Sequence, residues 1–180
     1  MDTYDALHSR RTVHNYEATE LDFEVVERIL AAGHMAPNHK LTWPWRFTVV
    51  GKETRKALLP VAYRLKNVTA PEMQARVQSK LINPATLIVV TQERAEDPFR
   101  NTEDYAATCC AIQNMMLAAT AEGLGSKWST GALTKHPDVC NLLGIDIDVE
   151  DVVGFIWVGV PMKVPSIERP ALETHVKVLS

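Results

Sequence analysis

Residues 101–122 constrain the fold more than any other part of this 180-residue sequence. Apolar side chains recur at helical spacing along one face of the segment and also fill the faces beside it: Tyr105, Cys109, Ile112, Met116 and Ala119 on the first, and Ala106, Ala107, Ala111, Met115 and Ala118 on the others. A helix that is apolar nearly all round is buried on nearly all sides. At 1.5 Å per residue it is about 30 Å long, close to the diameter of a small domain. We therefore predict that a second subunit helps to cover it, and that Cys109 and Cys110 are small core residues.

Around this helix the sequence predicts further helices interleaved with a few strands. Expected helices span residues 3–9, 23–33 (with Asp22 as N-cap), 52–66 and 136–143, and expected strands span residues 47–50, 85–90 and 151–160. Residues 67–80 are polar and contain Pro71, so we expect a solvated connector, with a flap over a pocket as the alternative. The last twenty residues contain three prolines and should lie across another surface. This order of elements predicts an α+β or α/β fold with one central sheet, formed by residues 1–180 as a single domain.

Composition excludes several classes of partner. A chain of 180 residues that is 46% hydrophobic can bury a sizeable core. Its formal net charge of −3 offers no basic field for nucleic acid or an anionic membrane. No apolar run is long enough to span a bilayer, and residues 1–11 lack the apolar core of a signal peptide, so we expect a cytoplasmic protein. Three cysteines, two of them adjacent, form neither a disulfide framework nor a metal-binding pair, and we predict no metal site.

The stretch HMAPNHKLTWPWRF, residues 34–47, is the first candidate site. Pro37 and Pro44 prevent a helix from continuing through it, and the stiffened loop carries Asn38, His39, Lys40, Trp43 and Trp45. Binding residues favour loops of this kind. The plainer interpretation is that Trp45 belongs to the core and that His39 is an ordinary satisfied polar group.

Two further segments carry candidate binding groups. Arg10, Arg11 and Thr12 could form a fork for a phosphate, although two cations at a helix C-terminus also simply complement the helix dipole. Later in the chain, residues 128–131 place a tryptophan beside two hydroxyl groups and a glycine that permits close approach of a ligand. The preceding Gly123 is adequately explained as a helix terminator.

Three segments in this order, HSRRTVHNY, APNHKLTWPWRF and EGLGSKWSTGAL, resemble the nitroreductase family of FMN-dependent oxidoreductases, in particular its small-subunit branch. The resemblance runs along the whole chain. It implies an α+β fold of the nitroreductase type, with a central and mainly antiparallel sheet flanked by helices and an extended C-terminal tail. It also implies an intertwined homodimer with FMN at the subunit interface.

The resemblance further implies a set of cofactor-binding residues. For FMN these are Arg10, Arg11 and Thr12 at the phosphate and ribityl end, Met35 and His39 from the other subunit, and Trp128, Ser129, Thr130 and Gly131. For the nicotinamide nucleotide they are Thr120, Ala121, Glu122 and Gly123. No catalytic side chain is implied, because N5 of the flavin carries the chemistry. The chain departs from larger members at His14, where they have a basic residue, and at Leu41 and Trp43, where they have amides. Larger members also use a basic group near the C-terminus on the phosphate, a role for which Lys177 is the candidate here.

The function implied is ping-pong hydride transfer from NADH or NADPH, through FMN, to a small-molecule acceptor such as a nitroaromatic or a quinone. Two other hypotheses remain. The first is a non-catalytic dimeric module that binds flavin or another ligand. The second is a metal-dependent hydrolase built on His34 and His39, although these histidines are not at the i, i+4 spacing of a helical ligand pair.

Overall fold

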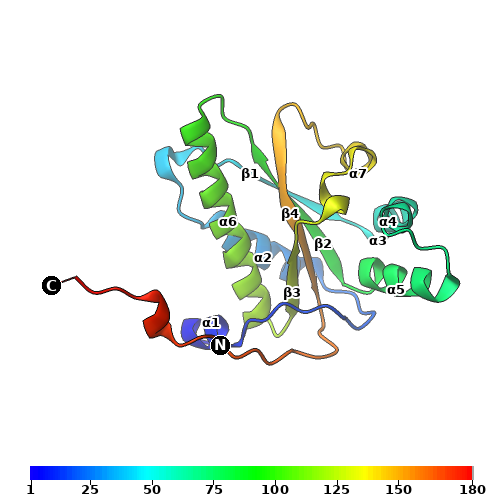
Figure 1. Cartoon of the computed structure of the whole chain (residues 1–180), viewed down its shortest axis with the longest axis horizontal. Helices are drawn as coiled ribbons and strands as arrows, with labels where there is room; N and C mark the ends of the chain where they lie inside the picture. Colours follow the sequence, from blue (N-terminus) through cyan, green and yellow to red (C-terminus); the bar gives the residue numbers. More distant parts are fainter. Residues whose placement is uncertain (180) are drawn as a thin grey trace.

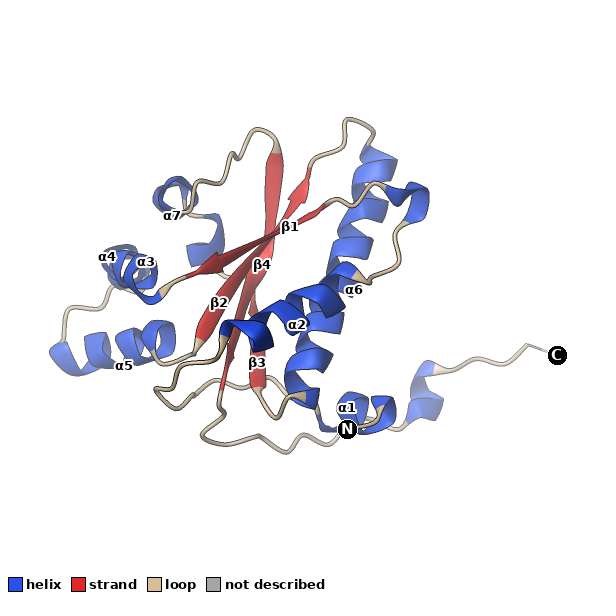
Figure 2. Ribbon diagram, turned by 180° about the vertical axis from the view of Figure 1, so that it is seen from behind, coloured by secondary structure: helices blue, strands red, loops and turns tan. Residues whose placement is uncertain are grey.

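A four-stranded antiparallel sheet lies at the centre of the computed structural model, which describes residues 1–179. Its strands are β1 (Trp45–Val50), β2 (Thr86–Glu93), β3 (Gly125–Ser129) and β4 (Glu150–Gly159), in the spatial order β1-β2-β4-β3. Every neighbouring pair is antiparallel. Helices cover both faces of the sheet (Figures 1 and 2). The predicted α+β class with a mainly antiparallel central sheet is confirmed.

One face of the sheet packs against α2 (Phe23–His34) and α6 (Pro98–Ala121) (Figure 1). The other face is covered by α3 (Lys52–Ala57), α4 (Leu59–Leu65), α5 (Pro71–Ile82) and α7 (Pro137–Leu142). Because successive side chains of a strand point to opposite faces, Leu87 and Val89 of β2 enter the second core while Ile88 and Val90 enter the first. The continuous apolar run of β2 is therefore explained by burial on both faces, as predicted.

The two end segments of the chain lie on the same side of the molecule, away from the sheet. Helix α1 (Thr3–Ser9) packs near the C-terminal end of α6, and the tail after residue 162 runs past it with one short turn, η3 (Leu172–His175) (Figures 1 and 2). Tail side chains are almost all exposed. Two more 3₁₀ turns, η1 (His39–Leu41) and η2 (Ala132–Lys135), occur in loops. Within residues 1–179, no helix is both long and apolar enough to cross a membrane.

Several local predictions are wrong. Residues 67–80 form most of α5 instead of a connector, because Pro71 occupies the first helical turn, where its missing N–H costs nothing. The single helix expected over residues 52–66 is two helices that bury Leu58 between them. Cys110 is exposed in the single chain, as is the neighbouring Tyr105. Residues 125–129, which are not among the expected strands, form strand β3.

Two glycines of β4 stand where other groups come close. A Cβ added to Gly154 would overlap the indole of Trp128 and lie 3.0 Å from the Ser129 carbonyl oxygen. At Gly159, an added Cβ would lie 2.8 Å from the backbone nitrogen of Ala85. Both close approaches explain why glycine occurs within this strand. The contact at Gly154 also allows Trp128 of β3 to lie close to β4.

Candidate functional site

The N-terminal segment lies directly beside β3. Thr12 forms a parallel bridge with Ser126, and the amide of Val13 donates to the Ser126 carbonyl at 2.9 Å. Two segments singled out in the sequence, residues 10–12 and 128–131, are thus brought to one strand of the sheet. Arg11 already uses some of its hydrogen-bond donors within the chain, since its guanidinium donates to the carbonyls of His8 and Arg10 at 2.7 and 2.8 Å.

Three guanidinium groups gather at the start of this segment. Partial burial lowers the pKa of Arg10, and the positive charges of Arg169 and Arg11 lower it further. Arg169 comes from the C-terminal tail and was not singled out in the sequence. The only signal for it was a basic residue within a proline-rich tail. Neighbouring cations of this kind form a region suited to an anion.

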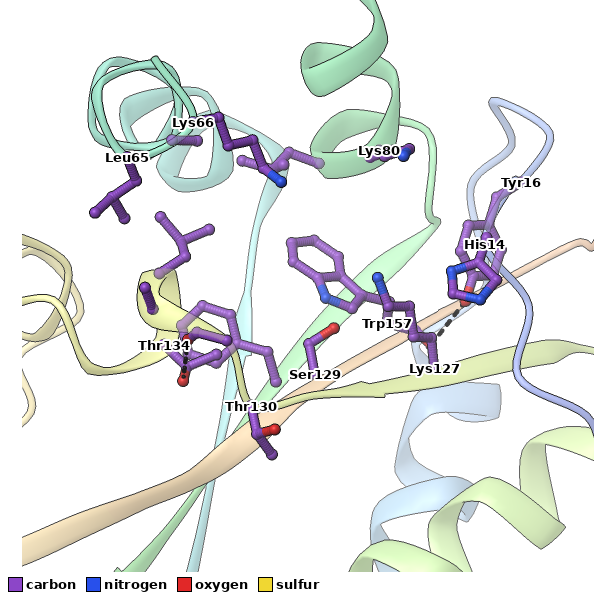
Figure 3. A pocket seen from close by; sticks show the side chains of 16 residues that line it. His14, Tyr16, Leu65, Lys66, Lys80, Lys127, Ser129, Thr130, Thr134 and Trp157 are labelled. Atoms are coloured by element: carbon purple, nitrogen blue, oxygen red, sulfur yellow. Dashed lines mark hydrogen bonds between the residues drawn. The ribbon is translucent and has the colours of Figure 1, made fainter. Parts of the chain in front are cut away.

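A cavity of about 480 Å³ opens on the same side of the sheet as α4, α5 and α7 (Figure 3). The lining includes Ser129, Thr130 and Gly131, which are three of the residues predicted to bind the cofactor. The Ser129 hydroxyl is buried and has no hydrogen-bond partner within residues 1–179. An orphaned buried hydroxyl costs free energy unless a ligand satisfies it. Beside it, Thr134 donates to the carbonyl of Gly131 at 2.9 Å and so shapes the turn after β3.

Cations surround this cavity. The lining includes Lys66 at the end of α4, Lys80 in the last turn of α5, Lys127 of β3, and His14, and it contains no aspartate or glutamate (Figure 3). Burial lowers the pKa of Lys127, and the charges of Lys80 and Lys66 lower it further. The sequence prediction did not include these lysines. Strand alternation would have found Lys127, because it shares a face of β3 with Ser129.

The cavity has an aromatic and aliphatic floor. Phe155 and Trp157 of β4 lie edge to face with ring centroids 6.3 Å apart, and Leu133 joins them in the lining. Tyr16 donates its hydroxyl to the carbonyls of Val13 and Trp157 at 3.0 and 3.4 Å, and burial raises its pKa strongly. The tyrosine is thus a neutral group that ties the N-terminal segment to β4. The floor suits a flat apolar ligand.

Some predicted residues do not reach the cavity. The Trp128 side chain lies on the opposite face of β3, packs against the core beneath α2 and α6, and donates to the Val153 carbonyl at 3.3 Å. None of residues 120–123 lines the cavity. There, Glu122 receives two hydrogen bonds from Arg28, at 2.7 and 3.0 Å, and Gly123 ends α6 with φ of +76°. Helix termination and packing account for this stretch in the single chain.

The loop between α2 and β1 presents Met35 and His39 to solvent. Met35 is 79% exposed, and the His39 Nδ1 lies 2.8 Å from a carboxylate oxygen of Glu103. Neither residue lines the cavity of its own chain. Trp45 is buried, as the plainer interpretation held, and donates to His34 at 3.2 Å. In the part of the chain that the structure describes, no three His, Cys, Asp or Glu side chains are arranged to hold a metal ion.

The loop backbone is held in an unusual conformation. Lys40, Leu41 and Trp43 all have positive φ angles, of 65°, 55° and 50°, which residues other than glycine rarely adopt. Asp104, 3% exposed, accepts a hydrogen bond from Thr42 at 2.6 Å. The side-chain amide of Asn38 donates to the Thr42 hydroxyl at 3.0 Å, and its oxygen accepts from the Trp43 amide at 2.7 Å. A buried carboxylate on α6 thus anchors a strained loop.

Comparison with known proteins agrees with this architecture. The Nitroreductase family model matches residues 7–160. A Bacillus subtilis (strain 168) protein named "Putative NAD(P)H nitroreductase YfhC" is 30% identical over 171 residues, which cover 92% of this chain and 87% of the relative. The crystal structure of a nitroreductase-like family protein from Bacillus cereus has a TM-score of 0.84 at 25% identity and covers 99% of this chain and 96% of its own.

A second solved structure links the fold to a flavin. The FMN and NADPH-dependent nitroreductase NfnB from Sphingopyxis sp. strain HMH, solved in a mutant form, has a TM-score of 0.81 at 18% identity and covers 99% of both chains. At that identity the likeness concerns the fold. The family match and the Bacillus subtilis relative carry the assignment. The resemblance seen in the sequence is confirmed, and the chain belongs to the nitroreductase family.

Proposed function

We propose that this protein is an FMN-dependent oxidoreductase that takes hydride from NADH or NADPH and reduces a small acceptor such as a nitroaromatic or a quinone. The observation that carries the proposal is the cavity beside β3, where a buried, unpartnered Ser129 hydroxyl lies in a cationic and apolar lining. Relatives named as FMN- and NAD(P)H-dependent nitroreductases support the same cofactor pair.

The residues along β3 fit FMN in both charge and length. Five strand residues span about 16 Å, roughly the length of an FMN molecule from phosphate to ring. Arg10, Arg11 and Thr12, beside Ser126, would hold the phosphate and ribityl end, with Arg169 as a further cation. Ser129 and the backbone around Gly131 would bind the polar edge of the ring. The chemistry that FMN supplies there is a hydride relay in two half-reactions, which gives ping-pong kinetics.

We also propose that two copies of the chain pair through α1, α2, α6 and the tail. Large apolar side chains are exposed on these elements: Tyr4, Leu7, Phe23, Met35, Tyr105, Ile167, Leu172 and Val176. Monomeric proteins rarely leave so many apolar groups together in water. Met35 and His39 are exposed and do not line the cavity of their own chain, so in a homodimer they would be available to approach the flavin of the partner.

The visible absorbance spectrum of the purified protein tests the function. We expect a flavin band that bleaches when NADPH or NADH is added without oxygen and returns on addition of a nitroaromatic or quinone. A flavin band that neither nucleotide bleaches would contradict the proposal in favour of a non-catalytic flavin-binding module. A protein that remains colourless after incubation with FMN would contradict the cofactor itself.

A further inference from the structure

Positive charge lies at two separate places around the proposed flavin site. The first place is the arginine group, Arg10, Arg11 and Arg169, beside the start of β3. The second is the lysine group, Lys66, Lys80 and Lys127, around the cavity. Neither Arg10 nor Arg11 lines that cavity. A single FMN phosphate is matched by the arginine group, so the lysine group has charge left for a different anion.

The positive charges of the lysine group repel one another when no anion is bound. Its members come from α4, α5 and β3, so the fold, rather than a local run of basic residues, brings them together (Figure 3). None of the three forms an ion pair within residues 1–179. Their mutual repulsion is evident at Lys127, whose pKa falls through burial and through the charges of Lys80 and Lys66. Uncompensated like charges around a partly buried space favour a bound anion.

The rest of the cavity lining indicates the character of the part of the ligand that is not anionic. Leu65, Leu81 and Leu133 join Phe155 and Trp157 in the lining, while the three lysines are polar groups that the proposed flavin contacts do not use (Figure 3). A mostly apolar pocket with a few convergent polar groups binds a ligand with an apolar body and fixes its orientation through the polar groups. An aromatic molecule with one carboxylate has that character.

We propose that the lysine-lined cavity selects electron acceptors that carry a carboxylate or phosphate, with the oxyanion bound by Lys127 and Lys80 and the flat body held over the floor formed by Phe155 and Trp157. This inference rests on the proposed function, which makes the bound molecule an electron acceptor. The anion site itself rests on the cavity alone. The hydride donor is the other molecule that can supply such an anion, because NADPH carries one phosphate that NADH lacks.

The test compares two probes of nearly equal shape, 4-nitrobenzoate and 4-nitrobenzamide. For the FMN-loaded protein we expect kcat/KM to favour the carboxylate by about tenfold, the effect of one or two charge-assisted hydrogen bonds. Calorimetric titration of the oxidised protein should give the same order of dissociation constants without turnover. The preference should shrink as NaCl is raised, because salt screens charges at a partly exposed site.

Substitution then locates the site. Lys127→Gln and Lys80→Gln should each reduce the preference severalfold, and the double variant should abolish it. Lys52→Gln is the matched control, since Lys52 is exposed and lies outside the cavity lining. If Lys127→Gln misfolds, Lys80→Gln alone decides, because Lys80 is exposed at the surface of α5.

Other outcomes overturn the proposal. Equal constants for both probes in the unmodified protein would show that the cavity does not select anions. Loss of discrimination between NADPH and NADH in the lysine variants, with the probe ratio unchanged, would assign the charges to the hydride donor. Weaker FMN retention with an unchanged probe ratio would assign them to the flavin. Should the protein bind no FMN at all, the proposed function fails, and titration of the flavin-free protein with 4-nitrobenzoate still tests the anion site.

Discussion

At the scale of single residues, Arg169 links the tail to the arginine group. Its charge contributes to the lowered pKa of Arg10, although the two are far apart in sequence. We predict that Arg169→Gln weakens FMN binding by about 1.5–3 kcal/mol, the range for a hydrogen bond to a charged group. Fluorescence titration of flavin-free protein with FMN measures the change.

Lys177 provides the control for this prediction. It is an exposed cation of the same tail, and the family resemblance leaves open whether it contacts the phosphate. Lys177→Gln should leave FMN affinity unchanged, while Arg10→Ala with Arg11→Ala should lower it more than Arg169→Gln alone. Equal losses for Arg169→Gln and Lys177→Gln would remove Arg169 from the site.

Gly154 offers a test of packing at one atom. An added Cβ would overlap the Trp128 indole, so Gly154→Ala forces the tryptophan or strand β3 to move. We predict a loss of about 1–3 kcal/mol in the free energy of unfolding, as for overpacked cores, measured by urea denaturation. Gly51→Ala is the matched control, because no atom lies within 4 Å of its added Cβ and its φ of −66° suits alanine.

At the scale of elements, the loop of residues 37–44 depends on one carboxylate of α6. Asp104→Ala removes the charged acceptor of the Thr42 hydroxyl, and with it the buried carboxylate that anchors the loop. We predict a loss of about 1–3 kcal/mol in stability and faster amide hydrogen exchange in residues 38–43. Glu103→Gln, which weakens the partly exposed pairs with His39 and Arg100, should cost less than about 1 kcal/mol. Equal exchange in both variants would contradict the anchoring role.

The pair between Arg28 and Glu122 makes the packing of α2 on α6 dependent on pH. Hydrogen bonds from Arg28 lower the pKa of Glu122 in the folded chain. The pair therefore stabilises the fold above the unfolded pKa of about 4.3, and its contribution disappears as pH falls through the lower folded value. Arg28→Gln should move acid unfolding to a higher pH in a circular dichroism titration. Lys52→Gln, a charge change outside any ion pair in the described chain, should not.

Elements with a strong pattern could be predicted from the sequence, and elements defined by their neighbours could not. The apolar run of β2 predicts a buried strand, and the apolar faces of α6 predict a buried helix. Strand β3, GSKWS, has no apolar alternation, and it is a strand because β4 and residues 12–13 hydrogen-bond to it. Similarly, α5 has a weak apolar face that becomes clear only where Val77 and Leu81 meet the core.

At the scale of the whole molecule, the proposed homodimer is open to direct measurement. We predict a sedimenting mass of about twice 20.1 kDa at micromolar concentration. Replacing Ile167, Leu172 and Val176 by serine removes apolar area that the tail would bury on its partner, and should weaken association at least about tenfold. Leu142→Ser, an exposed apolar position on α7 on the other side of the sheet, is the control. A monomeric unmodified protein would contradict the proposal.

The cavity depends on the whole fold in the same way. Ser129, Thr130 and Gly131 could be predicted from one continuous motif. Lys66 and Lys80 reach the cavity only because α4 and α5 fold over the sheet, and no local pattern in either helix indicates this. Sequence motifs thus identified the wall made by β3, while the opposite wall required the three-dimensional structure.

The exposed tail also has a consequence for the order of events in folding. Both cores are complete without residues 163–179, so this segment lies outside the cooperative unit of its own chain. A protease acting on dilute protein should trim it before it attacks the sheet. In the proposed homodimer, each chain would therefore fold first and bind its partner second, and that second step would hold the tail, with Arg169, in place beside Arg10.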